Sequence, residues 1–233
     1  MPDTTALLIV YSRCNDAKRS AEWSDWYDEV QLPDSVGPGR ADVATRFELL
    51  EQPTPLMPSI GFSHLSLYEF SGADADARLD ALLADDASLR RKGRVHPNHC
   101  VIGVDILKAH GRETKPPPHA ELQGHILAYV LCNQPEREAE WDAWYDEVHL
   151  PDMLDSGAFS AGTRWRRRVP LAYGSNDLTL YDVSRCSLDE AVERSAAVMP
   201  GIAAAGRKHP CHAGGMVVKA KASGRHAGAG YRA

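Results

Sequence analysis

The chain has 233 residues, of which 43% are hydrophobic and 25% are charged, a balance that is ordinary for a globular protein with a buried core. Its formal net charge is −6 and it has no dense basic stretch, which argues against nucleic acid or an anionic membrane as a partner. No run approaches the ~20 apolar residues that span a bilayer.

The first half predicts the order strand, helix, strand, strand, helix, strand. An apolar, β-rich stretch opens the chain, and it lacks the basic region and cleavage site of a signal peptide. Trp23, Trp26 and Tyr27 recur at helical spacing, and Pro33 is expected to end that helix. Gly93 is expected to end the second helix. The other predicted elements are strands at 6–14, 44–50, 61–70 and 99–109 and a helix at 75–92.

The second half repeats the first. EWSDWYDEVQLPD at residues 22–34 and EWDAWYDEVHLPD at residues 140–152 agree at ten of thirteen positions. The offset of 118 residues also aligns ATRF (44–47) with GTRW (162–165), and an offset of 113 aligns GRVHPNH (93–99) with GRKHPCH (206–212). Two gapless blocks separated by one five-residue deletion predict a tandem duplication.

The doubled order predicts an α+β protein with two ferredoxin-like βαββαβ units. A sheet with both helices on one face leaves its other face bare, so we expect the two units to cover each other within the chain. The expected boundaries are 1–110 for the first unit and 124–222 for the second. A linker with three consecutive prolines occupies 111–123, and a Gly/Ala-rich flexible tail occupies 223–233.

The helix ending WYDEVHLPDML, followed by GTRW, resembles the dimeric α+β barrel superfamily and within it the EthD-like branch. In that branch a helix ending in a His-x-Pro element precedes a strand that carries an arginine. The resemblance covers both halves. It implies an intramolecular dimeric α+β barrel with His149 near a pocket between sheet and helices. Gln31 replaces this histidine in the first half, so the first half departs from the pattern.

His149 is the first candidate for chemistry. A helix dipole favours the charged form of a histidine near the helix C-terminus, and its reference pKa near 6.5 suits proton transfer at neutral pH. A cap on the helix is the alternative role. The repeated aromatic residues are interpreted mainly as core, with Tyr145 the one expected to expose its hydroxyl to a ligand.

Charged residues occur at matched positions in both halves. Asp28 and Asp146, with the glutamate that follows each, are interpreted as a solvated helix face. Arg46 and Arg164 lie in matched strands. A structural ion pair with these acids is the first interpretation of the arginines, and binding of a carboxylate or phenolate is the second.

The HPNH and HPCH segments place two histidines three residues apart in both halves. Three interpretations stay open: two ligands of a divalent metal, pocket lining, or turn chemistry. The topology puts this segment opposite the C-terminus of the first helix, so His149 is not expected to meet His209 and His212. Five cysteines form no CxxC pair, which predicts reduced thiols and a cytoplasmic location.

We expect a small-molecule enzyme, a cofactor-free lyase or isomerase resembling dehydratases and cyclases, that moves a proton on a hydrophobic or aromatic substrate. His149 is the expected general acid/base, and Tyr145 or Arg164 is expected to polarise a substrate oxygen. No metal ligand is assigned. The residues expected to bind the substrate are Trp141, Trp144, Trp165, His209 and His212.

Two alternatives have the same fold. One is a haem- or metal-dependent dehydratase or oxygenase, because relatives in the superfamily include haem enzymes. The other is a non-catalytic accessory protein that binds a small molecule. In each case the expected partner is a small molecule rather than nucleic acid or membrane. Pairing of two pseudo-dimers into a homodimer stays open.

Overall fold

The computed structural model describes residues 4–50, 61–114 and 122–228. These residues form two compact units. Unit 1 contains residues 4–49, 61–108 and 222–228. Unit 2 contains residues 109–114 and 122–221 together with residue 50.

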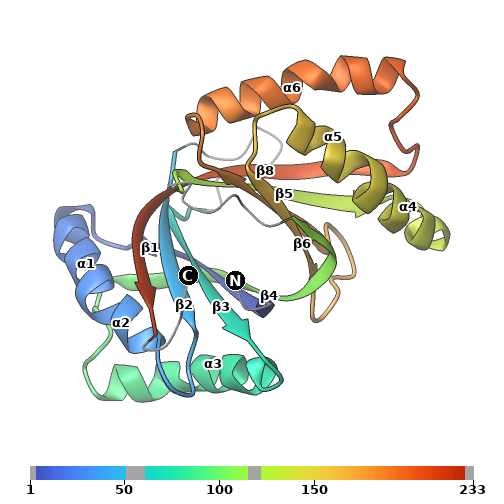
Figure 1. The fold of residues 1–233 in the computed structure, drawn as a ribbon. Coiled ribbons are helices and arrows are strands. Elements are labelled where there is room, and N and C mark those ends of the chain that lie inside the picture. The colour runs from blue at the N-terminus through green and yellow to red at the C-terminus, as the bar shows by residue number, and fades with distance from the viewer. Residues whose placement is uncertain (1–3, 51–60, 115–121, 229–233) are drawn as a thin grey trace. The chain divides into compact units, whose positions relative to one another are not determined.

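Unit 1 consists of an antiparallel sheet with helices packed on one face (Figure 1). Strand β1 pairs with β3 and β4, and β3 also pairs with β2, so the strand order is β4-β1-β3-β2. Ala6 and Leu8 of β1 pack with Trp23 and Tyr27 in one apolar core. The elements are β1 (Thr4–Cys14), α1 (Ser20–Trp26), α2 (Leu32–Ser35), β2 (Val43–Leu49), β3 (His64–Ser71), α3 (Ala75–Arg91) and β4 (His99–Thr114), of which residues 109–114 belong to unit 2.

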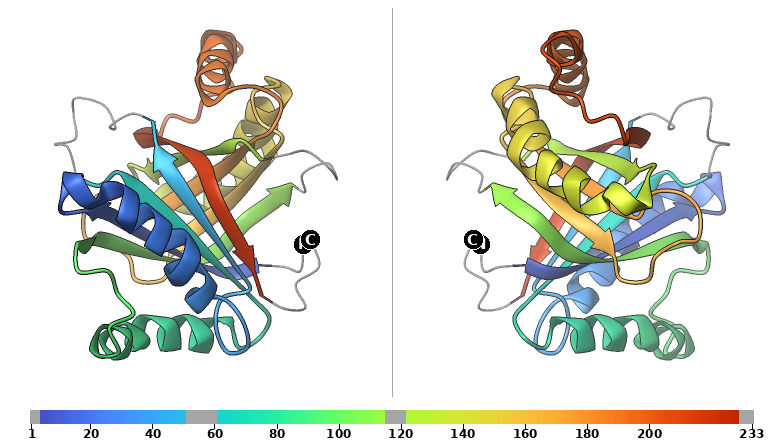
Figure 2. Two further views of the ribbon diagram at one scale, coloured as in Figure 1. Left: turned by 90° about the vertical axis from the view of Figure 1, so that its left-hand side faces the viewer. Right: turned by 90° about the vertical axis from the view of Figure 1, so that its right-hand side faces the viewer.

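Unit 2 has the same order of elements (Figures 1 and 2). Strand β5 pairs with β7 and β8, and β7 also pairs with β6, so the strand order is β8-β5-β7-β6. Its core is built around Trp141 and Tyr145, neither of which has any exposed surface. The elements are β5 (Gly124–Cys132), α4 (Glu138–Trp144), α5 (Leu150–Asp155), β6 (Ala161–Arg167), β7 (Asp177–Val183), α6 (Leu188–Ala204) and β8 (His212–Ala227).

A π-helical turn joins the two α-helical segments of the first helix in each unit. The turns span Tyr27–Gln31 and Tyr145–His149. The helices then continue through Pro33 and Pro151, each at the start of the next α-helical segment. The prediction that these prolines end the helices is therefore wrong. A proline is tolerated in a first helical turn, where its missing N–H has no partner to lose.

The second helix of each unit ends as predicted at a glycine. Gly93 and Gly206 have φ of +67° and +69°, a region that glycine enters without steric cost. The N–H of each glycine donates to a carbonyl of the last turn, at 3.0 Å in both cases. These bonds satisfy carbonyl groups that a helix end leaves without a partner.

The α+β class and the doubled β-α-β-β-α-β order match the prediction. The strand ends differ from it, because β4 continues to Thr114 and β8 to Ala227. Residues 111–114 of the expected linker and 223–227 of the expected tail are thus β-strand, and the three linker prolines lie outside the described residues. The tandem duplication, the ferredoxin-like description and the intramolecular barrel stay predictions.

Candidate functional site

His149 ends the π-helical turn of unit 2 and lies among aromatic rings. Its ring centroid is 4.6 Å from that of Tyr145, 5.1 Å from that of Trp144 and 5.2 Å from that of His212. The side chain is buried, with 7% of its surface exposed. Neither ring nitrogen has a hydrogen-bond partner among the residues the structure describes. His149 is therefore held by packing against aromatic rings rather than by hydrogen bonds.

His212, the first residue of β8, provides the second imidazole of the site. Its Nδ1 accepts a hydrogen bond from the Trp141 indole N–H at 3.3 Å. An acceptor nitrogen carries no proton, so the neutral ring holds its proton on Nε2. The imidazole pair, defined as His149 and His212, thus has one ring with a fixed tautomer and one ring held by packing alone.

His209 has a structural arrangement. Its Nδ1 accepts from the Cys211 backbone N–H at 3.2 Å, and its Nε2 lies 3.1 Å from a carboxylate oxygen of Glu140. Both ring nitrogens are thereby occupied. The HPCH segment is a hydrogen-bonded turn whose second histidine alone faces the candidate site.

The proximity of His149 to His212 contradicts the expectation that the two would lie apart. Strand β8 does begin beside the end of β5, where Cys132 pairs with His212, as the topology requires. However, helical side chains tilt towards the helix N-terminus, so the His149 ring reaches back over Tyr145. Side-chain direction, which the strand and helix order does not include, brings the two rings together.

Burial makes both imidazoles poor proton acceptors. It lowers the pKa of His149 to about 3, and the positive charges of His212 and Arg164 act in the same direction, whereas Asp152 opposes them. The pKa of His212 falls to about 4, again mainly through burial, with Lys208 contributing. The expected stabilisation of charged His149 by the helix dipole is outweighed, so both rings are neutral at pH 7.

Unit 1 has the same turn and the same aromatic residues but lacks the imidazole pair. The Trp23 indole donates to Nδ1 of His99 at 3.2 Å, and the Asn98 N–H donates to Nδ1 of His96 at 3.1 Å. At the position of His149, Gln31 has its side-chain amide 3.5 Å from the hydroxyl of Ser35. Features present in both units serve the fold, which leaves His149 as the distinguishing residue of unit 2.

The hydroxyl of Tyr145 is held by two hydroxyl groups of strand β7. The Thr179 hydroxyl donates to the Tyr145 oxygen at 2.9 Å, and the Tyr181 hydroxyl lies 3.3 Å away. Burial raises the pKa of Tyr145, so the phenol stays protonated. The ring edge contacts His149, while the hydroxyl is directed at the sheet.

Arg164 lies beneath the first helix of unit 2 with its charge compensated. Its guanidinium is 2.7 Å from Asp142 and 2.9 Å from Asp146, and it stands 4.5 Å from the centre of the Tyr145 ring. Arg46 of unit 1 likewise pairs with Asp28 at 3.3 Å. The structural ion pair expected for these arginines is confirmed. The solvated face is confirmed for Glu29 and Glu147, which are exposed, whereas Asp28 and Asp146 are partly buried and bind the strand arginines.

The three tryptophans assigned to substrate binding lie in different surroundings. Trp141 is completely buried in the core, whereas Trp144 is partly exposed, stacks on His149 and donates its indole N–H to the Arg207 carbonyl at 2.7 Å. Trp165 donates to the Thr163 hydroxyl at 3.0 Å. Because successive residues of a strand point to opposite faces, Trp165 faces away from Arg164 and the helices. Of these three tryptophans, only Trp141 and Trp144 contact the imidazole pair.

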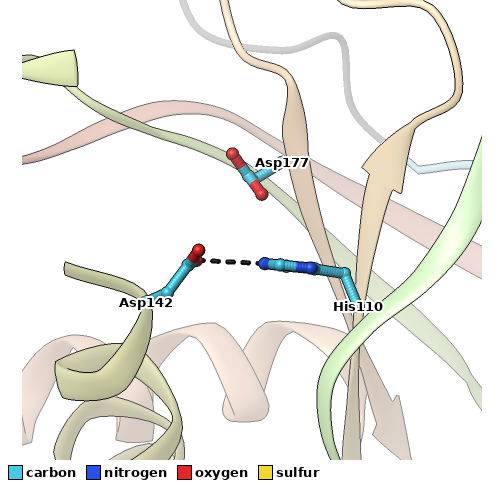
Figure 3. Close-up of side chains that lie close together, drawn as sticks. All are labelled: His110, Asp142 and Asp177. Carbon is cyan, nitrogen blue, oxygen red and sulfur yellow. Dashed lines mark hydrogen bonds and ion pairs between the residues drawn. The ribbon is translucent and has the colours of Figure 1, made fainter. Parts of the chain in front are cut away.

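His110, Asp142 and Asp177 form a cluster that sequence reasoning missed (Figure 3). One ligand atom from each lies within 4.8 Å of the others, and His110 Nε2 is 3.1 Å from Asp142. His110 belongs to β4, far from the other two in the sequence. No motif at a fixed spacing signals such a group.

The donor set of this cluster does not fit a metal ion. Arg164 binds Asp142 at 2.7 Å, and Arg166 binds Asp177 at 2.8 Å, so guanidinium groups already occupy carboxylate oxygens. Burial raises the pKa of Asp142, but hydrogen bonds from His110 and Arg164 outweigh it and hold that pKa well below its usual value. The arrangement is a partly buried ion-pair network.

A separate depression of about 410 Å³ lies in unit 1, beside α3. Arg40 and Asp85 line it and form an ion pair at 2.6 Å. It contains none of the residues predicted to act on a substrate. None of the described helices is long and apolar enough to cross a membrane.

No family model matches this chain, and no curated protein matches it significantly. Several solved structures do match it in fold. A "putative monooxygenase" from Fusobacterium nucleatum superposes with a TM-score of 0.56 and 12% identity over 97% of this chain and 95% of its own. An anthrone oxidase-like protein superposes with a TM-score of 0.54 and 12% identity over 98% of this chain and 95% of its own.

A mutant chlorite dismutase from Candidatus Nitrospira defluvii gives a TM-score of 0.54 and 10% identity over 95% of this chain and 92% of its own. These structures are members of the dimeric α+β barrel superfamily, and similarity at such low identity shows the fold alone. The chain thus shares the fold of these three structures. Its placement in the EthD-like branch stays a prediction.

Proposed function

We propose that the chain is an enzyme for a small hydrophobic or aromatic molecule and that it works by proton transfer at His149 without a cofactor. One observation carries the proposal: of two units built alike, only unit 2 pairs two neutral imidazoles among the described residues, and one of them, His149, has no protein partner at either ring nitrogen. A scaffold without chemistry to perform has no need for this difference. The three structures with the same fold bear names of enzymes, which agrees with the proposal.

In the proposed reaction, neutral His149 first acts as a base. It removes a proton from a carbon next to a carbonyl group of the substrate, and the resulting imidazolium returns that proton to another substrate atom. The overall change is an isomerisation, or a dehydration if the proton is returned to a departing hydroxyl. A pKa of about 3 makes the free ring a weak base. The enolate formed beside it favours the imidazolium and raises that pKa during the reaction.

The surrounding residues have distinct proposed roles. His212 donates its Nε2–H to the substrate oxygen, since its Nδ1 is held by Trp141. Trp144 covers His149 and excludes water. Tyr145 and Arg164 act as positioning residues through ring packing and charge, because the Tyr145 hydroxyl and the Arg164 guanidinium are committed to protein partners.

Deuterium uptake from D2O into a panel of aromatic and polyketide-like ketones, followed by NMR, tests the proposal. Wild-type protein should label the carbon next to the carbonyl in at least one compound. His149→Gln, which copies residue 31 of unit 1, should label it about 10²- to 10⁴-fold more slowly. Gln31→Ala is the matched control and should leave the rate unchanged.

Equal labelling by wild type and His149→Gln would remove His149 from the reaction. Saturable binding of a panel compound without any labelling would favour a non-catalytic binding protein. Both outcomes contradict the proposal.

A haem enzyme is the second candidate, and the similarity to chlorite dismutase favours it. A histidine that would hold haem iron needs a ring nitrogen with a free lone pair. His149 fits this requirement, whereas His209 does not, because both of its nitrogens are occupied. Haem would supply redox chemistry in place of proton transfer. A Soret band that appears on adding haem to the protein and is absent in His149→Gln would select this candidate.

A further inference from the structure

Cys132 and Cys211 meet in unit 2 although 79 positions separate them in the sequence. Cys132 ends β5 and pairs with His212, the residue that follows Cys211. The backbone N–H of Asn133 donates to the carbonyl of Cys211 at 2.9 Å, which ties the two segments together beside both side chains. Cys211 is the last residue of the turn before β8, and this hydrogen bond places it beside the end of β5.

Their thiols share one residue as hydrogen-bond acceptor. The Cys132 thiol donates to the backbone carbonyl of Gln134 at 3.1 Å, and the Cys211 thiol donates to the side-chain oxygen of Gln134, also at 3.1 Å. Both thiols thus lie against Gln134, and a disulfide would bring their Cβ atoms to about 3.8 Å from each other.

We propose that Cys132 and Cys211 are a redox-active dithiol that closes to an intramolecular disulfide by exchange with a low-molecular-weight disulfide. Cys132 reacts first because it is partly exposed, whereas Cys211 is completely buried. The Cys132 thiolate attacks one sulfur of the small disulfide and releases one thiol, which leaves a mixed disulfide on Cys132. Cys211, as its thiolate, then attacks the Cys132 sulfur and releases the second thiol. The protein loses two electrons and two protons, and the small disulfide gains them.

Unit 1 lacks this pair, which argues that the fold does not require it. Cys14 occupies the position of Cys132 and donates to the Asp16 carbonyl at 3.1 Å. Asn98 stands where Cys211 would be, and its side-chain oxygen accepts from Arg19 at 3.1 Å. The dithiol, like the imidazole pair, occurs only in unit 2.

Closure of the disulfide also affects the candidate site. Cys211 lies between His209 and His212, and its N–H holds the His209 ring. Moving its sulfur from Gln134 to Cys132 shifts this turn and with it the imidazole of His212. This consequence for activity rests on the proposed function, whereas formation of the disulfide does not.

The test uses the whole, fully reduced protein with oxidised glutathione as the probe. Free thiols are counted after alkylation, and peptides are mapped by mass spectrometry. Free thiols should fall from five to three, with one linked peptide pair containing Cys132 and Cys211. Burial raises the pKa of the Cys132 thiol, so the reaction should accelerate as pH rises.

Cys211→Asn, which copies Asn98, is the matched variant. It should accumulate the glutathione adduct on Cys132, because the thiol that resolves it is missing. Cys14 of the wild type is an internal control and should form no internal disulfide. A wild type that accumulates the same adduct, or that keeps both thiols free after prolonged oxidation, would overturn the proposal. Neither result depends on whether the protein is an enzyme.

Discussion

Replacing His149 by glutamine is expected to make the folded protein more tolerant of acid. Burial holds the pKa of His149 near 3 in the folded state, while the unfolded chain has the ordinary value of 6.5. Below pH 6.5 the unfolded chain therefore binds a proton that the folded chain does not. Stability must fall as pH decreases from about 6.5 towards 3, and glutamine cannot contribute to this loss.

The size of the effect follows from the difference between the two pKa values. Each pH unit below 6.5 costs the folded state about 1.4 kcal/mol until the folded pKa is reached. From pH 7 to pH 5 the loss due to His149 is therefore about 2 kcal/mol. With 7% of its surface exposed, the ring is little screened by water, so no large discount applies.

Urea unfolding followed by circular dichroism at pH 7 and pH 5 measures this loss. The wild type should lose about 2 kcal/mol more between the two pH values than His149→Gln does. Comparing the two losses cancels any packing defect of the variant that is the same at both pH values. Gln31→Ala should behave as the wild type. An identical pH dependence of wild type and His149→Gln would refute the reasoning that burial keeps this imidazole neutral.

Other substitutions compare matched positions of the two units, each by urea unfolding. Arg164→Met should cost about 3 kcal/mol because it removes two ion pairs of a buried guanidinium and leaves Asp146 without its cation. Arg46→Met should cost about 1 kcal/mol or less, because the Asp28 partner is half exposed and two of the Arg46 nitrogens have no hydrogen bond. Equal costs of the two substitutions would contradict this reasoning. Ser187→Ala removes the capping box of α6 and should cost about 1 kcal/mol, whereas Asp74→Ala, at a helix start without a side-chain cap, should cost less than about 0.5 kcal/mol. Thr179→Val should cost about 1 kcal/mol by removing a donor to the buried Tyr145 hydroxyl, and an unchanged midpoint would show that this bond contributes nothing.

The sequence repeat and hydrophobic periodicity predicted the elements of each unit, because burial in this chain follows the helical and strand periods. Trp23 and Trp141 are core residues of their units, Trp26 and Trp144 pack against those cores, and Gly93 ends its helix. The prolines misled the prediction: a proline is read as a helix terminator, yet it can also occupy the first turn of a continuing segment. Nothing in the sequence marks the π-helical turn that makes this possible.

The site was predictable only in part. His149 could be selected because the repeat lacks it at Gln31, and the arginine ion pairs could be expected from matched positions. Its contact with His212 depends on the direction of a side chain, and the His110 cluster depends on which strands become neighbours. Both arise from tertiary packing, which a single sequence does not encode at any fixed spacing.

The π-helical turn has a consequence for how the site can be altered. A π turn holds one residue more than the corresponding α turn. Removing one residue from 145–149 would restore regular α-helix, because the π turn takes up its extra residue locally. The segments before and after the turn would keep their places, and only the side chains within the turn would change direction. A change in chain length by a single codon can thus redirect the side chains of this turn while the core around Trp141 and Leu150 is retained.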